Sequence, residues 1–389
     1  MVIRARVAPT SEVERIVVDL FTDHDLDRQL WWETLDGKPP DSLDRLDPLA
    51  IALLPKAMNF SQDLHLEGPV SYQLLANLEE FVDAWTHWRP DIFQRVRITA
   101  EEIIDDRTDA PGPLAATAMC AFSGGVDATY ATFAHRNRLL GRRSLDLAGA
   151  VLVHGFDIPL DDPEGFAVAA RAAAVITGEL EIPLVTMRTN WQAVADPEWE
   201  MSFGAALGSV LHLFSDRAGV AAMAADNTYS QITIPWGSNP ITGPLLSSSR
   251  MRLVHTGAGQ TRTQKCEAIG QLDSVREHIR VCWAGDDLGR NCGRCEKCVR
   301  TKVNFLAAGH GVVPALGPLE PRQLRTLTIS SEGAYAIYAE MRDELHLLPP
   351  DVADDLVWLL DQPIQPHSDH GTAVAAVEGS SSRWRRRRG

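Results

Sequence analysis

The feature that most constrains the fold of this chain is an apolar run that ends in two glycines and leads into a helix. Residues 118–122 are expected to form a buried strand, Ser123-Gly124-Gly125 a tight turn, and residues 127–136 the start of a helix. Backbone N–H groups and the helix dipole then face the turn, and glycine lets an anion approach the backbone. An ordinary glycine turn is the alternative. The residues predicted to bind a phosphate group are Ser123, Gly124, Gly125, Val126, Asp127 and Thr129.

Apolar strand patterns and helical patterns alternate from Cys120 onward, which predicts an α/β fold with a parallel sheet covered by helices on both faces. The expected strands are 117–122, 148–154, 183–188, 220–225 and 252–255, and the expected helices are 128–140, 163–178, 202–216 and 263–270. Ligands of such sheets bind beyond the carboxyl ends of the strands. The loop at Ser123 and the segments 154–157, 188–190 and after 225 should therefore share one rim.

The sequence also predicts further parts outside this core. Residues 1–113 form an N-terminal α/β module, with a strand or helix edge at 50–54, strands at 64–70 and 96–100, a helix at 71–82, and a linker at 108–113. Residues 114–310 form the core, 311–365 a helical extension, and 366–389 a disordered basic tail, for which a docking arm toward RNA or an acidic partner is the alternative. The tryptophans of the N-terminal module are assigned to its core rather than to a ligand platform.

Four cysteines predict a metal site near the end of the core. Their spacing is C-x9-C-x2-C-x2-C, and four of the six cysteines of the chain fall within residues 282–298. Thiolates at this spacing can surround one ion, and four sulfur ligands favour Zn²⁺. Free thiols, disulfides or a redox pair are the alternatives. The predicted zinc ligands are Cys282, Cys292, Cys295 and Cys298.

The glycine loop and the cysteine knuckle, in this order, resemble the PP-loop family of N-type ATP pyrophosphatases, and within it the 7-cyano-7-deazaguanine synthases. The resemblance covers about residues 116–310, although Ala128 stands where the family usually has Ser or Thr. It implies a fold of the adenine nucleotide alpha hydrolase (HUP) type and cleavage of ATP between its α and β phosphates.

The resemblance also assigns roles to residues. The segment at His154 and Gly155 would contact adenosine, and Lys265 would reach the phosphates, with Arg262 as its substitute. Independently, a bare carboxylate repels phosphate, so Asp127 is expected to act together with Mg²⁺. The resemblance places the acceptor substrate against the loop 226–250, where the predicted lining residues are Asp226, Trp236, Ser238 and Arg250.

The resemblance therefore implies an ATP-dependent ligase that adenylates an acyl oxygen of a small-molecule substrate. Pyrophosphate leaves, and ammonia or an amine then displaces AMP to give an amide or a nitrile. Sulfur insertion into a small molecule or tRNA, and a non-catalytic nucleotide-binding protein, are the alternatives. The net charge of −15 argues against general nucleic-acid binding, and no apolar run is long enough for a membrane helix. A cytoplasmic protein is expected, and a homodimer stays open.

Overall fold

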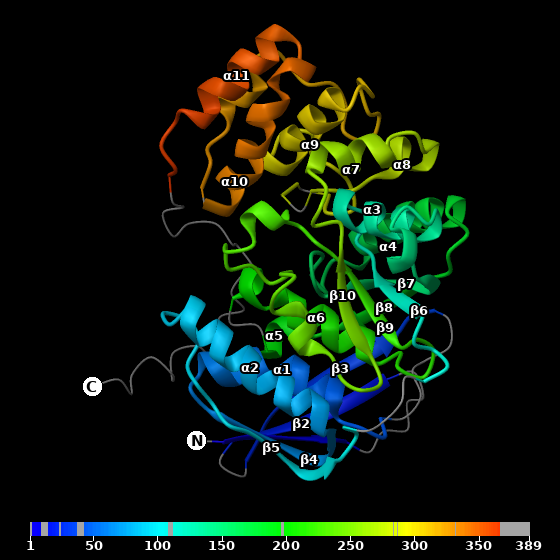
Figure 1. Ribbon diagram of the computed structural model, residues 1–389, viewed down its shortest axis with the longest axis vertical. Helices are drawn as coiled ribbons and strands as arrows, with labels where there is room; N and C mark the ends of the chain where they lie inside the picture. The colour runs from blue at the N-terminus through cyan, green and yellow to red at the C-terminus, as the bar shows by residue number, and fades with distance from the viewer. Residues whose placement is uncertain are drawn as a thin grey trace.

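Figure 1 shows the computed structural model, which describes residues 2–8, 15–22, 25–36, 43–107, 112–195, 198–282, 284–285, 287–330 and 332–365. These residues form an α/β fold, in which helices flank a large and mostly parallel sheet. The strands are β1 (Val2–Val7), β2 (Arg15–Thr22), β3 (Asp25–Thr34), β4 (Asp63–Ser71), β5 (Ile98–Ile104), β6 (Thr117–Ala121), β7 (Asp146–His154), β8 (Leu184–Thr189), β9 (Val220–Ala224) and β10 (Arg252–Thr256).

The strands of the described residues join one sheet in the order β10-β9-β6-β7-β8-β3-β2-β1-β4-β5. The five strands from β10 to β8 are parallel to one another, as the alternating pattern predicts. Strand β3 then pairs antiparallel with β8, with Trp32 opposite Thr189. This pairing extends the parallel sheet directly into the N-terminal strands.

The helices come between and after these strands. The α-helices are α1 (Asp47–Asn59), α2 (Tyr72–Trp88), α3 (Val126–Arg136), α4 (Pro163–Glu179), α5 (Trp191–Ala195), α6 (Trp199–His212), α7 (Arg262–Ile269), α8 (Asp273–His278), α9 (Glu296–Ala307), α10 (Glu332–Glu340) and α11 (Pro350–Leu360). Short 3-10 helices are η1 (Gly141–Arg143), η2 (Tyr229–Gln231), η3 (Gly243–Leu246), η4 (Gln323–Thr326) and η5 (Met341–Leu347).

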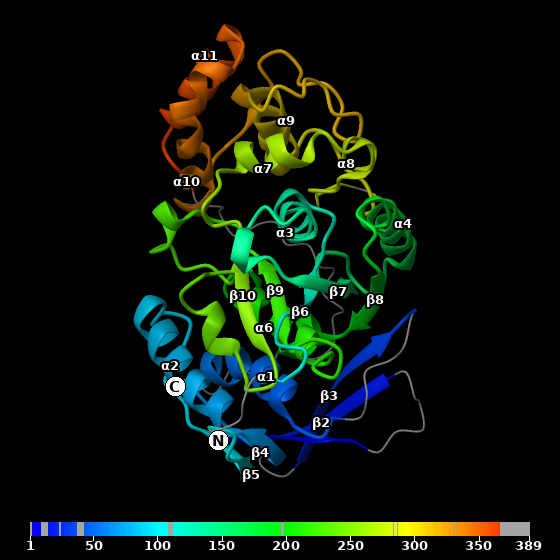
Figure 2. The same ribbon diagram turned by 45° about the vertical axis from the view of Figure 1, so that its right-hand side comes forward.

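Alternating side chains of the parallel strands enter two different cores. In β7, Val151 and Val153 pack into the core that contains α1, α2 and α6, whereas Ala150 and Leu152 pack into the core that contains α3, α4 and α7. Figures 1 and 2 show α3 and α4 on the side of the parallel strands that faces α7, α8 and α9, with α1 and α6 on the other side. The sheet is therefore buried on both faces, which explains the nearly continuous apolar sequence of β7.

The N-terminal strands share a core with the parallel strands. Buried Leu20 and Trp32 of this part belong to the same apolar cluster as Met119 and Met223. The sequence analysis did not find β1, β2 or β3, although the alternation in β1 was a visible signal. The strand or helix edge predicted at residues 50–54 lies inside helix α1. A boundary at residue 113 stays a prediction, and residues 108–111 of the expected linker lie outside the described part.

The C-terminal extension packs against α9. Val299 and Val303 of α9 join a third apolar cluster with Tyr338 of α10 and Leu356 of α11, which lie together at the top of Figure 1. The expected basic tail, 366–389, lies outside the described residues. Among the described residues, no helix combines the length and the apolar character that crossing a membrane requires.

The stability of this fold should fall in mild acid because His135 of α3 is buried in its neutral form. Its Nδ1 accepts from the N–H of Leu145 at 3.2 Å, so Nε2 carries the proton and donates to Thr256 Oγ1 at 2.9 Å. Burial, together with the charges of Arg138 and Arg143, lowers the pKa of His135 to about 4. Only the unfolded chain binds this proton between pH 6.5 and 4, so stability is lost as the pH falls through this window.

The loss attributable to His135 should reach about 3 kcal/mol. Denaturant unfolding at several pH values measures this loss. Glutamine does not titrate, so in His135→Gln the number of protons taken up on unfolding, which sets the slope of stability against pH, should fall by up to about one. Equal slopes in the parent and the variant would contradict this assignment.

Candidate nucleotide site and metal centre

The Ser-Gly-Gly loop joins the carboxyl end of β6 to the N-terminus of α3, as the sequence predicts. Gly124 has a φ of +76°, a conformation that a residue with a Cβ rarely adopts. Gly125 is the N-cap of α3, and no side chain caps its first turn. The N–H of Gly125 donates to Ser123 Oγ at 3.3 Å. An uncapped helix N-terminus preceded by two glycines is a suitable place for an anion.

The loop borders a cavity of about 210 Å³ at the carboxyl ends of β6, β7 and β9. Helix α6, helix α7 and the segment 280–282 form its other walls. The lining residues include Ser123, Gly125, Val126, Asp127, Phe156, Asp157, Trp199, Glu200, Phe203, Asp226, Trp236, Ser238, Arg262, Arg280, Cys282 and Lys297. The structure thus brings the predicted loop and much of the predicted acceptor region to one cavity.

Asp127 is the centre of an ionic network on the wall of this cavity. Its Oδ2 accepts from Arg262 Nη1 at 2.8 Å, and its Oδ1 accepts from Lys265 Nζ at 2.9 Å. Burial alone would raise the pKa of Asp127, but the charges of Arg262 and Lys265 outweigh it and lower the pKa. Asp127 therefore stays ionised and fixes both cations.

Lys265 does not itself line the cavity. Its side chain is only 1% exposed, and its ammonium group donates to Ala225 O at 2.7 Å as well as to Asp127. Arg262, one turn earlier on α7, does line the cavity, and its Nε is buried with no hydrogen-bond partner among the described residues. Of these two cations, Arg262 is therefore the one placed to reach the cavity, while Lys265 holds Asp127.

Three of the four predicted acceptor-binding residues line the cavity. Trp236 Nε1 donates to Asp226 Oδ2 at 2.8 Å, and Ser238 Oγ donates to Ala224 O at 2.6 Å. Burial, and then the nearby negative charge of Asp127, raise the pKa of Asp226. This side of the cavity combines a carboxyl group of raised pKa with a wall of aromatic rings, in which Phe203 contacts both Trp199 and Trp236.

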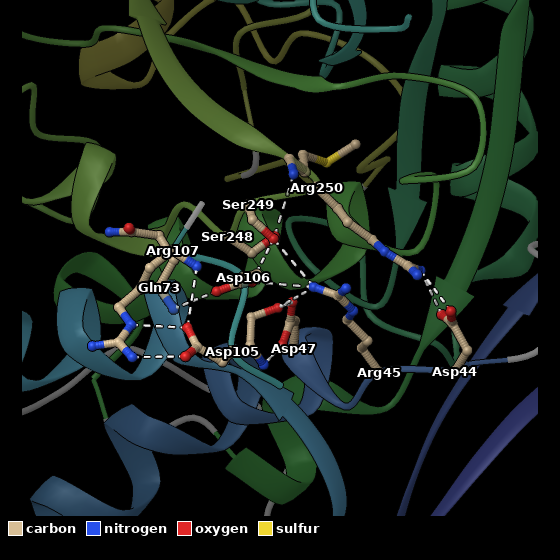
Figure 3. Close-up of polar contacts among 12 residues, drawn as sticks. Asp44, Arg45, Asp47, Gln73, Asp105, Asp106, Arg107, Ser248, Ser249 and Arg250 are labelled. Atoms are coloured by element: carbon tan, nitrogen blue, oxygen red, sulfur yellow. Dashed lines mark hydrogen bonds and ion pairs between the residues drawn. The ribbon is translucent and has the colours of Figure 1, made fainter. Parts of the chain in front are cut away.

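The fourth predicted residue, Arg250, lies elsewhere. Figure 3 shows its guanidinium directed at Asp44, and its Nη1 lies 2.7 Å from Asp44 Oδ1. Arg250 lines a separate cavity of about 330 Å³, together with Arg45, Asp47 and His212. The reason is topological: Arg250 precedes β10 and so lies at its amino end, whereas the candidate site lies at the carboxyl ends of the strands.

Besides Lys265, four predicted cofactor-binding residues do not line the cavity: Gly124, Thr129, His154 and Gly155. The hydroxyl of Thr129 is buried and unpartnered among the described residues. The ring of His154 stacks on Phe166 at 4.4 Å, and its Nε2 donates to Pro159 O at 2.7 Å. Gly155 has a φ of +98°, and a Cβ there would lie 2.0 Å from Thr189 O. The contacts of His154 and Gly155 account for these two residue types without a ligand.

The four predicted zinc ligands come together, and their sulfur atoms all lie within 4.8 Å of one another. Cys282 Sγ is 3.6 Å from Cys295 Sγ, and Cys292 Sγ is 3.9 Å from Cys298 Sγ. A tetrahedral Zn²⁺ with bonds of about 2.3 Å needs sulfur atoms about 3.8 Å apart. Gly293 provides the left-handed turn between them, with a φ of +71°. The cluster can hold a metal ion such as zinc.

The backbone around the cysteines also suits thiolate ligands. The N–H of Cys295 donates to Cys292 Sγ, and that of Ala284 donates to Cys282 Sγ, both at 3.3 Å. Lys302 Nζ anchors the turn by donating to Gly293 O and Pro318 O, both at 2.7 Å. Such hydrogen bonds around the ligand sulfurs fix their positions, as outer contacts do at metal sites.

The sequence analysis missed several residues of the site. Arg280 and Lys297 line the cavity beside the metal cluster, and Trp199, Glu200 and Phe203 line it from α6. Their positions in the sequence could have identified the two cations, because Arg280 comes two residues before Cys282 and Lys297 lies between Cys295 and Cys298. Nothing in the sequence of α6 marks its residues as site residues rather than core residues.

Comparisons of the chain with models of protein families, with curated proteins and with solved structures find no match. The interpretation of the site therefore depends on the residues and their geometry.

Proposed function

We propose that this protein binds ATP at the Ser-Gly-Gly loop and uses it to adenylate a small-molecule substrate, in a core of the PP-loop, HUP-type class. One observation carries the proposal: the uncapped N-terminus of α3, Arg262, Arg280 and Lys297 all border one cavity in a chain of net charge −15. Cations gathered against a helix N-terminus favour a polyphosphate ligand. The apolar and aromatic walls would accept the adenosine and the substrate.

The residues of the cavity can also hold Mg²⁺. Asp127 and Asp226 line the cavity, and the negative charge of Asp127 helps to raise the pKa of Asp226. A divalent cation would relieve this repulsion, and carboxylate oxygens are ligands that Mg²⁺ prefers. The metal would neutralise phosphate charge. In this chain, Asp127 would orient Arg262, and Arg262 and Arg280 would bind the phosphate oxygens.

The proposed reaction is C–N bond formation through an acyl adenylate. An acyl oxygen of the substrate attacks the α-phosphorus of ATP, and the bond to the β-phosphate oxygen breaks to release pyrophosphate. Cations near the loop would stabilise the charge that grows on the leaving pyrophosphate. Ammonia or an amine then attacks the acyl carbon, AMP departs and a proton is lost from nitrogen. A cytoplasmic location is part of this proposal.

ATP-dependent sulfur insertion is the alternative, and the thiols outside the metal cluster bear on it. Cys120 and Cys266 are fully buried, and burial raises the pKa of Cys120 to about 11 and that of Cys266 further. A thiol that carries sulfur to a substrate has to be accessible and ionised. Because neither Cys120 nor Cys266 meets these requirements, a nitrogen nucleophile is favoured over sulfur.

The products of ATP decide between these functions. We expect substrate-dependent formation of AMP and pyrophosphate when α-labelled and γ-labelled ATP are incubated with the protein, Mg²⁺ and a metabolite extract with added ammonium. Chromatography separates the products. Formation of ADP and phosphate would contradict the proposal, binding without turnover would favour a non-catalytic nucleotide-binding protein, and dependence on sulfide would favour sulfur insertion.

A further inference from the structure

The segment that leads into the metal cluster (Cys282, Cys292, Cys295 and Cys298) contacts the Ser-Gly-Gly loop at residue 280. The N–H of Arg280 donates to Gly124 O at 3.0 Å. A Cβ built on Gly125 would lie 3.5 Å from Arg280 O, so the backbone of residue 280 runs closely along the loop. Two residues later, Cys282 is both a member of the metal cluster and a residue of the cavity wall.

The side chain of Arg280 lines the cavity without a counter-ion among the described residues. It is 7% exposed, and its Nε donates to Leu288 O at 2.8 Å. Its Nη2 is buried and has no hydrogen-bond partner among the described residues. A buried guanidinium with an unused donor is costly unless a ligand accepts from it. Arg262, which lines the same cavity, also has a buried Nε with no hydrogen-bond partner among the described residues.

Lys297 reaches the same cavity from the other part of the cluster. It lies between Cys295 and Cys298, at the beginning of α9, and it lines the cavity. The turn that carries it is anchored by the contacts of Lys302 described above. Both cations therefore lie on segments that also carry cysteines of the cluster.

We propose that Arg280 and Lys297 bind the polyphosphate of the nucleotide, and that the metal cluster is consequently a wall of the nucleotide site rather than a distant structural support. The proposal rests on the proposed function for the identity of the ligand. Arg280 presents planar donors that suit phosphate oxygens, and Lys297 contributes a compact charge. Loss of the metal would then release the two cations from the cavity and weaken nucleotide binding.

Calorimetric titration with inorganic pyrophosphate, and separately with ATP, tests the residues without requiring turnover. We expect Arg280→Met to weaken both affinities by about 10- to 100-fold, and Lys297→Met by a smaller factor. Arg290→Met is the matched control, because Arg290 lies in the neighbouring connection between Cys282 and Cys292 with 72% of its side chain exposed. It makes the same change of charge and should bind like the parent.

Thermal unfolding and metal content of each variant separate lost contacts from lost structure. Parent-like melting and metal content with weakened binding support the proposal, and parent-like binding by Arg280→Met overturns it. A variant that melts early is replaced by Arg280→Lys, which keeps the charge but not the planar donors and should regain part of the affinity. If it regains none while melting normally, the phosphate contact is refuted.

The metal linkage has its own readout. Because coupling between two ligands is reciprocal at equilibrium, ATP should raise the affinity for the metal, measured by competition with a coloured chelator, in the parent and not in Arg280→Met. Equal metal affinities with and without ATP, in a parent that binds ATP, would overturn the proposal while leaving the proposed ATP chemistry intact. A parent that binds neither pyrophosphate nor ATP would instead refute the proposed function.

Discussion

Replacing Cys295 and Cys298 together by serine should remove the bound metal, from about one Zn²⁺ per chain to almost none, and destabilise the fold. The four sulfur atoms lie within 4.8 Å of one another, which suits a shared zinc ion, and Cys282 and Cys298 also belong to the core formed by α3, α4 and α7. Binding of a structural metal contributes directly to the folding free energy. With several kcal/mol lost, the Tm should fall by about 10 °C or more.

Metal analysis of the purified protein and thermal unfolding measure these two effects. Cys266→Ala is a suitable control, because Cys266 is as buried as Cys298 but lies outside the cluster. It should keep the full metal content. Full metal retention in the Cys295→Ser/Cys298→Ser variant would contradict the metal assignment.

Replacing Lys265 by methionine should slow formation of AMP and pyrophosphate by about 100-fold or more, which corresponds to about 2.7 kcal/mol of transition-state stabilisation. Lys265 has a nearly fully buried ammonium group that is held by Asp127 and Ala225 O. Without it, Asp127 loses one of its two cations and no longer holds Arg262 in a fixed position at the cavity. The affinity for ATP should fall less than the rate, because Lys265 does not line the cavity.

A second variant distinguishes the proposed effect on the reaction from a loss of structure. Breaking a buried ion pair by removing one partner is destabilising by about 3–5 kcal/mol, so Lys265→Met should also melt earlier. Asp127 holds both Lys265 and Arg262, so the double variant Asp127→Asn/Lys265→Met is compared with Asp127→Asn alone. If Lys265 acts through Asp127, the two variants should form AMP and pyrophosphate at the same rate. A much lower rate in the double variant would show that Lys265 acts independently of Asp127.

The sequence predicted the core elements well where local signals were strong. The helix expected at 163–178 is α4, Pro163–Glu179, whose N-cap Asp162 accepts from the N–H of Gly165. The strand expected at 148–154 is β7, Asp146–His154. Such elements have apolar runs of the right length and a clear beginning, and neighbouring residues alone determine them. The N-terminal strands mix charged and apolar residues, and only the beginning of β1 alternates between buried and less buried side chains. In β2 the buried residues Val18, Asp19 and Leu20 are consecutive, so no alternation marks this strand.

The sequence by itself determined the glycine loop, its place between a strand and a helix, and the four thiols that can hold a metal. These features depend on residues that lie close together in the chain, so their spacing fixes their geometry. The tertiary structure alone decided which distant side chains meet. It joined β3 to β8, placed Lys265 behind Asp127, and left Arg250 at the amino end of β10. It also brought Arg280 to the loop at Ser123. The direction of each strand and the packing of α7 against α3 set these contacts, and no local pattern records them.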